Sequence, residues 1–457
     1  MTTRTQRKAG RISLTRDTFR LALFAIILIS VGRVHQHFGF LAALHPAKVF
    51  AALALFYAVL KPGAVNSEQI LTDWPSKIIV ALAVLACISA PFGLSLGGSG
   101  MFVLTVFAKV IVLALLLIAA TRDYRDLFTF VWAYVISCGI LVVFALTVFQ
   151  MGGGGGVARL SGGLYMYDPN DLGLVLITGL PLAVMTYRVT SGWKKIISVF
   201  VIVGIGAALA LTGSRGGFLG LVAVGGALLF MLREVPVLKR VALTAAVALG
   251  LFAMTPSGYW DRMETMMSPT EDYNWTDYSG RKQILERGVG YMLERPFLGV
   301  GIGNFERAEG TISERAKQYR NITGESVPAA RWLSPHNSYL EVGAELGVSG
   351  LLLWSGLLFG GIFSLYGLRR RLPASWKRGD PEERFLYEMT LFLPVAFFGF
   401  AVTCTFVSFA FLEIFYILAA YVSGLYISLR ARKRRATERS RAPDRVERRV
   451  PYSARAS

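Results

Sequence analysis

The chain has 457 residues, of which 54% are hydrophobic and 17% are charged, and its mean hydropathy is +0.51. This composition excludes a chain of two or three soluble domains and predicts a polytopic membrane protein. The formal net charge of +19 comes largely from arginine-rich ends, at residues 4–20 and 430–455. Basic ends beside terminal membrane helices are explained by topology and by anionic lipids, so we expect no nucleic acid partner.

Roughly twelve apolar runs are long enough to cross about 30 Å of hydrocarbon. They lie near residues 18–38, 43–60, 76–93, 101–120, 127–149, 169–187, 195–213, 215–232, 239–255, 337–367, 385–408 and 410–428. The stretch around Gly213 and Ser214 is too long for one crossing, and we divide it at LTGSRGG. We therefore predict an all-α membrane protein with about 12 transmembrane helices.

The basic residues orient these helices. With a cytoplasmic N-terminus, every strongly basic short loop falls on the cytoplasmic side, as the positive-inside rule requires. The long polar segment, in which basic and acidic residues nearly balance, then lies outside. The predicted organisation is a basic cytoplasmic N-terminus at 1–20, nine helices over 21–255, a partly helical outer loop at 256–335, three helices over 336–428, and a basic, disordered cytoplasmic tail at 429–457.

Several familiar chemistries are not indicated. The cysteines, Cys87, Cys138 and Cys404, all lie in predicted spans without a CxxC pair, which argues against disulfides and thiolate zinc sites. The segments MGGGGGVARL and GVGIGNF lack the spacing of nucleotide-binding loops, and we interpret their glycines as flexible or tight-turn residues. His35 and His37 have no carboxylate or cysteine partner nearby, so we read them as polar boundary residues. We expect neither a metal nor a cofactor.

The first candidate site residue is Arg215, in the turn that divides two predicted spans. The flanking glycines let the backbone approach a ligand, and a guanidinium group grips a diphosphate in a bidentate manner. An arginine here could also simply reach water, but its position favours a function.

The second candidate is Arg281, in the outer loop. From Arg281 to Arg295, apolar residues recur at helical spacing and predict an amphipathic helix that can lie on the membrane face: Ile284, Leu285, Val289, Met292 and Leu293. Arg281 stands at the start of this helix, where a cation opposes the helix dipole. Such a placement favours an anionic partner for Arg281, although a solvated surface arginine is the alternative.

The third candidate is His336, which directly precedes a membrane span. We expect Ser334 to cap the following helix, with Pro335 in its first turn. The positive end of that helix would lower the pKa of His336 and keep the imidazole neutral, the form that accepts a proton. Glu341 and Glu345 follow on one face of the span. They could orient His336, pair with an arginine, or lock helices together.

In chain order, the segments DPNDLG, TGSRGG, SGRKQIL, RPFLGVGIGNF and SPHNSYLEVGAELGVSGLLLW resemble the O-antigen ligase and polymerase superfamily of bacterial envelope proteins. The resemblance covers residues from about 160 to 365. It implies a glycosyltransferase of the polytopic GT-C type in the bacterial inner membrane, working on the periplasmic face without metal or nucleotide. Such proteins transfer a glycan from undecaprenyl diphosphate to an acceptor hydroxyl, with inversion at the sugar carbon.

The resemblance also implies roles for individual residues. The essential arginines of the family match Arg215 and Arg281, which would bind the diphosphate, and its essential histidine matches His336, which would act as the catalytic base. Possible supporting residues are Asn170, Arg295, Arg331, Asn337, Tyr339, Glu341 and Glu345. Fixed arginines suit a leaving diphosphate because its negative charge grows in the transition state.

Three functions remain open at this point. A ligase would pass the glycan to lipid A core or to a protein serine, and a polymerase would pass it to another lipid-linked repeat unit. Both need the same leaving group and the same kind of nucleophile, and the compact HNSYLEVGAELG segment favours the ligase slightly. A transporter or flippase for lipid-linked sugars is the third function, but transport by alternating access needs a site near the membrane midplane, whereas the candidates cluster on one face.

Overall fold

The protein is described here from a computed structural model. It describes residue 14 and residues 17–447 except 45, 61–62, 64, 153–158, 162–167, 232–234, 256–258, 265–276 and 330–331. Most of the glycine run at 152–156 and Arg331 therefore lie outside the described residues.

Each of the twelve predicted apolar runs contains a helix. They are α1 (Thr18–Gly32), α4 (Pro46–Leu60), α5 (Trp74–Phe92), α6 (Leu96–Phe102) continued through the π-helical η3 (Val103–Phe107) into α7 (Ala108–Ala120), α8 (Tyr124–Thr147), α9 (Pro169–Val189), α10 (Trp193–Thr212), α11 (Arg215–Met231), α12 (Val237–Met254), α18 (Ser338–Arg371), α19 (Pro381–Thr403) and α20 (Glu413–Glu447). In the described part of the chain, eight helices are long and apolar enough to cross a membrane, and α1 and α11 are apolar but shorter. The helical membrane fold is confirmed, while the count of twelve crossings stays a prediction.

The remaining elements are short. The connections contain α2 (Val34–His37), α3 (Gly39–Ala43), η2 (Ser67–Gln69), η6 (Ala374–Arg378) and η7 (Cys404–Phe406). The predicted outer loop contains α13 (Tyr259–Glu264), α15 (Arg281–Glu294), α16 (Phe305–Thr311) and α17 (Glu314–Thr323). A small antiparallel hairpin, β1 (Gln150–Gly152) with β2 (Arg159–Ser161), is an addition that the sequence did not predict.

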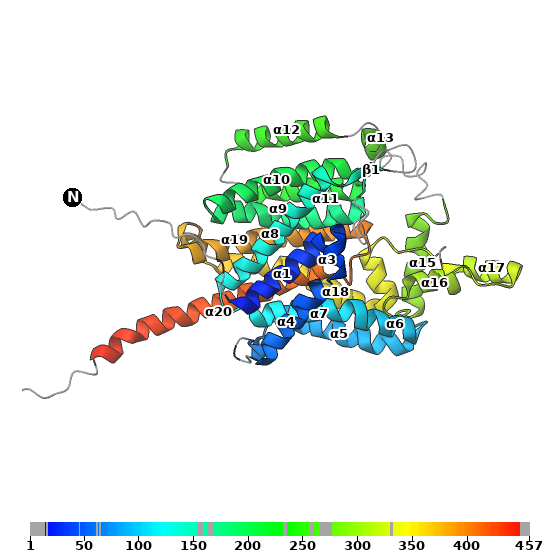
Figure 1. Cartoon of the computed structure of the whole chain (residues 1–457), viewed down its shortest axis with the longest axis horizontal. Coiled ribbons are helices and arrows are strands. Elements are labelled where there is room, and N and C mark those ends of the chain that lie inside the picture. Colours follow the sequence, from blue (N-terminus) through cyan, green and yellow to red (C-terminus); the bar gives the residue numbers. More distant parts are fainter. Residues whose placement is uncertain are drawn as a thin grey trace, which may run out of the picture.

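The long helices pack into one bundle (Figure 1). Helix α9 packs against α8, α10, α11 and α19, and α18 packs against α5, α19 and α20. Aromatic side chains fill the junction of α18, α19 and α20, where the ring centroids of Trp354 and Phe415 are 4.8 Å apart. The Trp354 indole also donates a hydrogen bond to the Ala410 carbonyl at 3.1 Å. Tyr339, in the first turn of α18, lies against this junction, because its ring centroid is 5.3 Å from that of Trp354.

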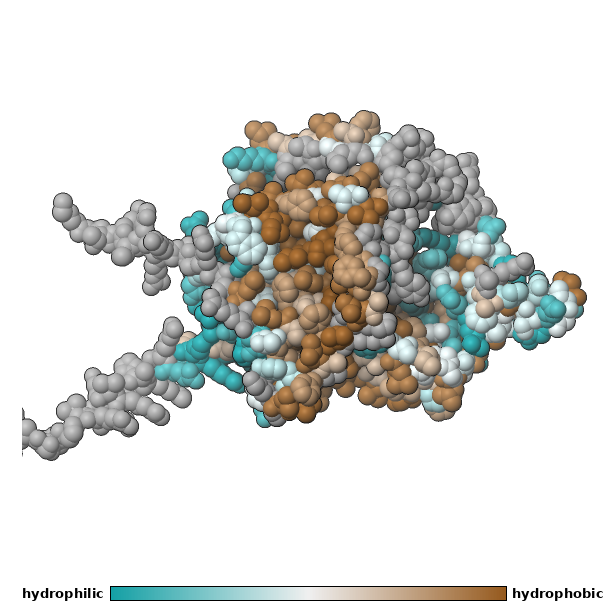
Figure 2. All heavy atoms as spheres, viewed as in Figure 1, coloured by the Kyte–Doolittle hydropathy of each residue, from teal (hydrophilic) through white to brown (hydrophobic). Residues whose placement is uncertain are grey.

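An apolar band separates two polar ends of the bundle (Figure 2). We call the end that carries α15, α16 and α17 the loop end, and the opposite end, from which α20 extends, the tail end (Figure 1). Since a bilayer needs apolar surface between two polar boundaries, this arrangement agrees with a membrane-spanning bundle.

Ion pairs tie the helices together at the tail end. Arg20, whose side chain is fully buried, joins α1 to Asp126 of α8 at 3.1 Å. Arg188 of α9 makes two hydrogen bonds of 2.9 and 3.0 Å to the Glu388 carboxylate of α19. Both pairs link helices that are distant in sequence, so they fix the bundle where it meets water.

The predicted disordered tail is partly helical. Helix α20 continues to Glu447, well beyond the expected boundary at residue 429. Arg432 explains much of this difference, because its guanidinium lies 3.2 Å from Asp380 and 3.1 Å from Glu382 at the start of α19. These contacts hold the first turns of the basic segment in helical form.

Candidate active site

The turn that carries Arg215 forms as predicted. Helix α10 ends at Thr212, Gly213 adopts a left-handed φ of 56°, and α11 begins at Arg215. The Ser214 hydroxyl accepts a hydrogen bond of 3.0 Å from the Gly217 N–H and thereby caps α11. Arg215, half-buried, is thus the first residue of a helix whose N-terminus opens at the loop end.

Asn170 holds this turn in place. Its side-chain oxygen accepts a hydrogen bond of 2.8 Å from the Ser214 hydroxyl, which joins the start of α9 to the start of α11. Asp168 caps α9 by accepting hydrogen bonds from the N–H groups of Asn170 and Asp171 at 2.6 and 2.9 Å. The DPNDLG segment is therefore a capped helix start that supports the Arg215 turn.

Arg281 is likewise the first residue of a helix, as predicted. The cap residue of α15 is Gly280, which offers no side chain to the first N–H groups of the helix. Ile284, Gly288 and Tyr291 form the buried face of α15, which packs against α18. A methyl group added at Gly288 would meet the Leu340 side chain at 2.7 Å. Close packing on α18 fixes the position of α15, and with it the backbone of Arg281.

The predicted apolar face of α15 is correct only in part. Ile284 is buried, but Leu285 and Leu293 remain 43% and 66% exposed. Besides Ile284, the helix packs through Gly288 and Tyr291. Neither belongs to the aliphatic residues and methionine from which the apolar face was predicted. The exposed leucines leave a second apolar stripe.

A buried ion pair fastens α15 to α16. Arg287 donates hydrogen bonds to the Glu309 carboxylate at 2.6 and 3.0 Å, and the Tyr291 hydroxyl donates to the same carboxylate at 2.7 Å. Burial and the Glu309 charge raise the pKa of Tyr291. The Arg287 guanidinium also lies 4.0 Å from the ring centroid of Tyr278. Sequence reasoning did not assign this pair, and it anchors the helix that begins with Arg281.

His336 lies outside the helix that was expected to contain it. Helix α18 begins at Ser338, and Asn337 is its cap, accepting hydrogen bonds from the N–H groups of Tyr339 and Leu340 at 3.0 and 3.1 Å. The prediction that Ser334 caps the helix was wrong: its hydroxyl donates to the Glu306 carboxylate instead. Asparagine caps as well as serine, and its closer position decided the helix start.

The backbone of His336 is held in an uncommon conformation. Its φ is +45°, and its N–H donates a hydrogen bond of 3.0 Å to the Ser408 hydroxyl. Left-handed backbone is unfavourable for a residue other than glycine and persists only where the surrounding structure enforces it. Here the enforcement comes from the segment between α19 and α20.

The surroundings keep the His336 imidazole neutral. Partial desolvation and the positive charge of Arg281 lower the pKa of His336 below its ordinary value of 6.5, while Asp168 and Glu306 act in the opposite direction. The lowered pKa was expected, but its causes are partial desolvation of a residue that stays exposed at the surface, and the charge of Arg281. Arg281, Asp168 and Glu306 therefore all lie within electrostatic reach of the imidazole.

One short segment connects the Arg215 turn to His336. A methyl group at Gly216 would meet the Phe406 side chain at 2.9 Å, so α11 begins directly against η7. Two residues later, Ser408 receives the His336 N–H. The structure thus brings the surroundings of Arg215, Arg281 and His336 together at the loop end.

The glutamates of α18 lock segments together, which was one of the three possibilities. Glu341 accepts a hydrogen bond of 3.1 Å from the Ala410 N–H. Glu345, only 4% exposed, accepts hydrogen bonds from the N–H groups of Gly303 and Phe305 at 2.6 and 3.0 Å. Both carboxylates hold backbone segments against α18. Tyr339 has a similar role, since its hydroxyl donates to the Ala401 carbonyl of α19 at 3.2 Å.

The GVGIGNF segment is a packing turn, as its glycines suggested. Val300 and Gly301 donate backbone hydrogen bonds to Ala344 and Glu345 at 2.8 and 3.0 Å. Gly301 has a φ of +95°, and a methyl group there would lie 2.7 Å from the Gly93 Cα. Only glycine allows so close an approach to α5 and α18.

Two further arginines behave differently. Arg295 is exposed at the far end of α15, away from Arg281. Arg33, which sequence reasoning missed, donates a hydrogen bond of 2.8 Å to Glu413 at the start of α20. The sequence did contain a hint of this role. Arg33 stands at the end of the first helix that faces outside in the predicted topology, where the positive-inside rule disfavours cations. Among the described residues, no three His, Cys, Asp or Glu side chains group around a possible metal ion.

Comparison with known proteins adds an independent line of evidence. No curated protein matches the chain. Residues 174–355 match the family model described as O-antigen ligase. The matched region contains Arg215, Arg281 and His336, as well as Glu345 and the GVGIGNF turn. The match covers less than half of the chain, and it supports the resemblance to the O-antigen ligase superfamily.

Proposed function

We propose that the protein is a glycosyltransferase that moves a glycan from undecaprenyl diphosphate to an acceptor hydroxyl at the periplasmic face of the bacterial inner membrane. The observation that carries this proposal is that Arg215 and Arg281 are both first residues of helices at the loop end, with Arg281 within electrostatic reach of His336. The match of residues 174–355 to the O-antigen ligase family model supports it.

The two helix starts form the diphosphate site. A helix N-terminus presents N–H groups and partial positive charge to an anion. Arginine at the first position adds a bidentate donor to the same point. An anionic ligand between the two helix starts would interact favourably with both guanidinium groups and with both helix dipoles. The polyprenyl chain would lie between apolar helices.

The transfer is one displacement at the sugar carbon. The acceptor oxygen forms a bond to the anomeric carbon while the bond to the diphosphate oxygen breaks, and the diphosphate departs with the electron pair. A single displacement inverts the configuration at that carbon. Arg215 and Arg281 stabilise the growing charge on the leaving group, so no acid has to protonate it and no metal is needed.

His336 receives the proton of the acceptor hydroxyl. Its neutral form is available at neutral pH because partial desolvation and Arg281 disfavour the charged form. Once protonated, the imidazolium faces the carboxylates of Asp168 and Glu306, which favour the charged form and hold it until water takes the proton. Neither carboxylate is required to contact the sugar.

The engaged glutamates argue against a transporter. Buried glutamates inside the spans would also suit a transporter, but Glu341 and Glu345 both accept hydrogen bonds from backbone N–H groups. The candidate residues lie at one end of the bundle rather than near its middle, which suits chemistry at one membrane face. The ligase and polymerase alternatives differ only in the acceptor.

Reconstitution tests the proposal. Purified protein in liposomes would receive an undecaprenyl-diphosphate-linked repeat unit, in the presence of a chelator, and either a lipid A core acceptor or additional repeat units. Glycan on the core acceptor with release of undecaprenyl diphosphate identifies a ligase, and lengthened lipid-linked chains identify a polymerase. Movement of the donor across the bilayer without a new glycosidic bond would identify a transporter and overturn the proposal.

A further inference from the structure

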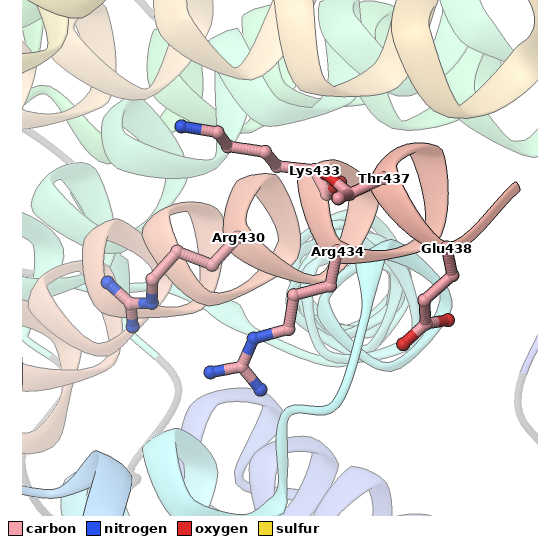
Figure 3. A pocket seen from close by; sticks show the side chains of 5 residues that line it. All are labelled: Arg430, Lys433, Arg434, Thr437 and Glu438. Carbon is pink, nitrogen blue, oxygen red and sulfur yellow. The ribbon is translucent and has the colours of Figure 1, made fainter. Parts of the chain in front are cut away.

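An open cavity lies along α20 at the tail end of the bundle, opposite to the candidate active site. Its volume is about 370 Å³, and it is lined by Arg430, Lys433, Arg434, Thr437 and Glu438. Figure 3 shows Arg430, Arg434 and Glu438 along one edge of the helix face, one turn apart, and Lys433 and Thr437 along its other edge. Three cations and one carboxylate therefore share one cavity.

The cavity lies at the depth of lipid headgroups. Helix α20 begins at Glu413, which pairs with Arg33 at the loop end. Lys433 follows about 30 Å farther along the axis, at 1.5 Å per residue, which equals the thickness of the hydrocarbon layer. The Trp376 ring, 5.1 Å from the Arg432 guanidinium, marks the same boundary, where aromatic residues gather in membrane proteins.

The cations of α20 divide into two sets. Arg432 and Arg435 face α19 and α8, where Glu382 and Asp123 pair with them at 3.1 and 3.5 Å. These contacts orient the helix. Lys433 and Arg434 instead line the cavity, and neither has an ion-pair partner within the part of the chain that the structure describes.

Arg430 gives the cavity a fixed wall. Its guanidinium makes two hydrogen bonds, of 2.6 and 2.8 Å, to the Asp73 carboxylate at the start of α5. Asp73 offsets the charge of Arg430, so Lys433 and Arg434 supply the net attraction for an anion. Thr437 and Glu438 add oxygen atoms that accept hydrogen bonds from hydroxyl groups.

We propose that this cavity binds the headgroup of an anionic phospholipid that carries one phosphate and a hydroxyl-bearing group. The phosphate lies between Lys433 and Arg434, and a headgroup hydroxyl donates to Glu438. The carboxylate repels headgroups of higher negative charge, so a glycerol phosphate ester fits better than a bare phosphate monoester. The proposal does not depend on the reaction at the loop end.

The experiment compares lipid retention by native mass spectrometry. The full chain is placed in nanodiscs of phosphatidylglycerol and phosphatidylcholine in equal amounts, then released gently, and the bound phosphatidylglycerol is counted. Lys433→Gln with Arg434→Gln is the test variant. Lys377→Gln with Arg378→Gln, which removes the same charge from η6 at the same end, is the matched control.

We expect the test variant to retain at least about tenfold less phosphatidylglycerol, because each surface cation contributes to the attraction of anionic lipid. The matched control stays within about twofold of the natural protein, since it leaves the cavity intact. Equal losses in both variants would show general surface attraction and overturn the proposal, as would unchanged retention in the test variant.

A charge-preserving exchange variant controls for misfolding. Lys433→Arg with Arg434→Lys keeps the charge and the lining, and we expect its retention to stay near that of the natural protein. Loss of lipid in this exchange variant would assign the effect to folding and overturn the proposal. Inorganic phosphate is the last probe: retention that persists in its presence supports a lipid site, whereas full displacement shows a site for free phosphate and overturns it.

Discussion

At the tail end of the bundle, Arg20 and Arg188 each lie against a carboxylate from another helix, whereas at the loop end Arg215 and Arg281 are the first residues of α11 and α15. The first arrangement holds helices together. The second places a cation at the start of a helix, where an anionic ligand would interact favourably with both the cation and the helix dipole. The comparison contrasts arginines that join helices with arginines that we propose to bind the substrate.

His336 strengthens the contrast. At the tail end, Arg20 and Arg188 are paired with carboxylates on regular helices, but at the loop end His336 has a left-handed backbone and a lowered pKa. Strain of this kind is typical of functional sites. These features of the loop end agree with the site that we propose there.

The largest expected effect is that of His336→Asn. Asparagine tolerates the left-handed backbone and removes the base, so we expect turnover to fall about 1000-fold while the fold is kept. Single-turnover transfer by the purified variant measures the rate, and thermal melting checks the fold. Transfer within about tenfold of the natural rate would exclude a proton-accepting role.

Arg215→Gln and Arg281→Gln should each reduce transfer about 100- to 1000-fold, because each removes a donor to the leaving diphosphate. The lysine variants should recover only part of the rate, since the charge remains but the bidentate contact does not. Arg295→Gln is the matched control, because Arg295 is exposed at the opposite end of α15. A similar loss in that control would contradict the assignment of Arg281.

At the tail end, Arg20→Met should act on stability instead. It removes one of the two arginines that bond the buried Asp126 carboxylate and leaves Arg122, so we expect a cost of about 1–3 kcal/mol. The additional change Asp126→Leu should restore part of the loss. We expect a lower melting temperature in detergent and an unchanged turnover per folded molecule. A lower turnover per folded molecule would contradict the assignment of a structural role to the tail end and a catalytic role to the loop end.

The pH profile of transfer should show the smallest change. Transfer needs neutral His336, so the rate is constant at high pH and is lost as pH falls through the pKa of His336, which lies below 6.5. Asp168→Asn removes a charge that raises this pKa but keeps a capping side chain, so the acid limb moves to lower pH. Arg281→Gln moves the limb to higher pH in its residual activity. Shifts in the same direction would refute this electrostatic arrangement.

Local sequence patterns predicted a large part of the architecture. Each apolar run became helical, the LTGSRGG split became the α10–α11 turn, and Arg281 begins its helix. These features depend on hydrophobicity, glycine and helix periodicity within a few residues. The exact start of α18 was missed because Ser334 and Asn337 both have capping chemistry, and the distant Glu306 took the serine hydroxyl.

Sequence alone determined that the chain crosses a membrane, where its helices lie, and which arginines and histidine are candidates, because apolar length and turn chemistry are local properties. Only the tertiary structure decided that Glu341 and Glu345 hold backbone segments, that Arg33 pairs with Glu413, and that Arg281 lies close enough to His336 to lower its pKa. Those outcomes depend on groups up to several hundred residues apart in the chain. Their partners are chosen when the helices pack, since a buried carboxylate or guanidinium must then find whichever donor or acceptor lies beside it.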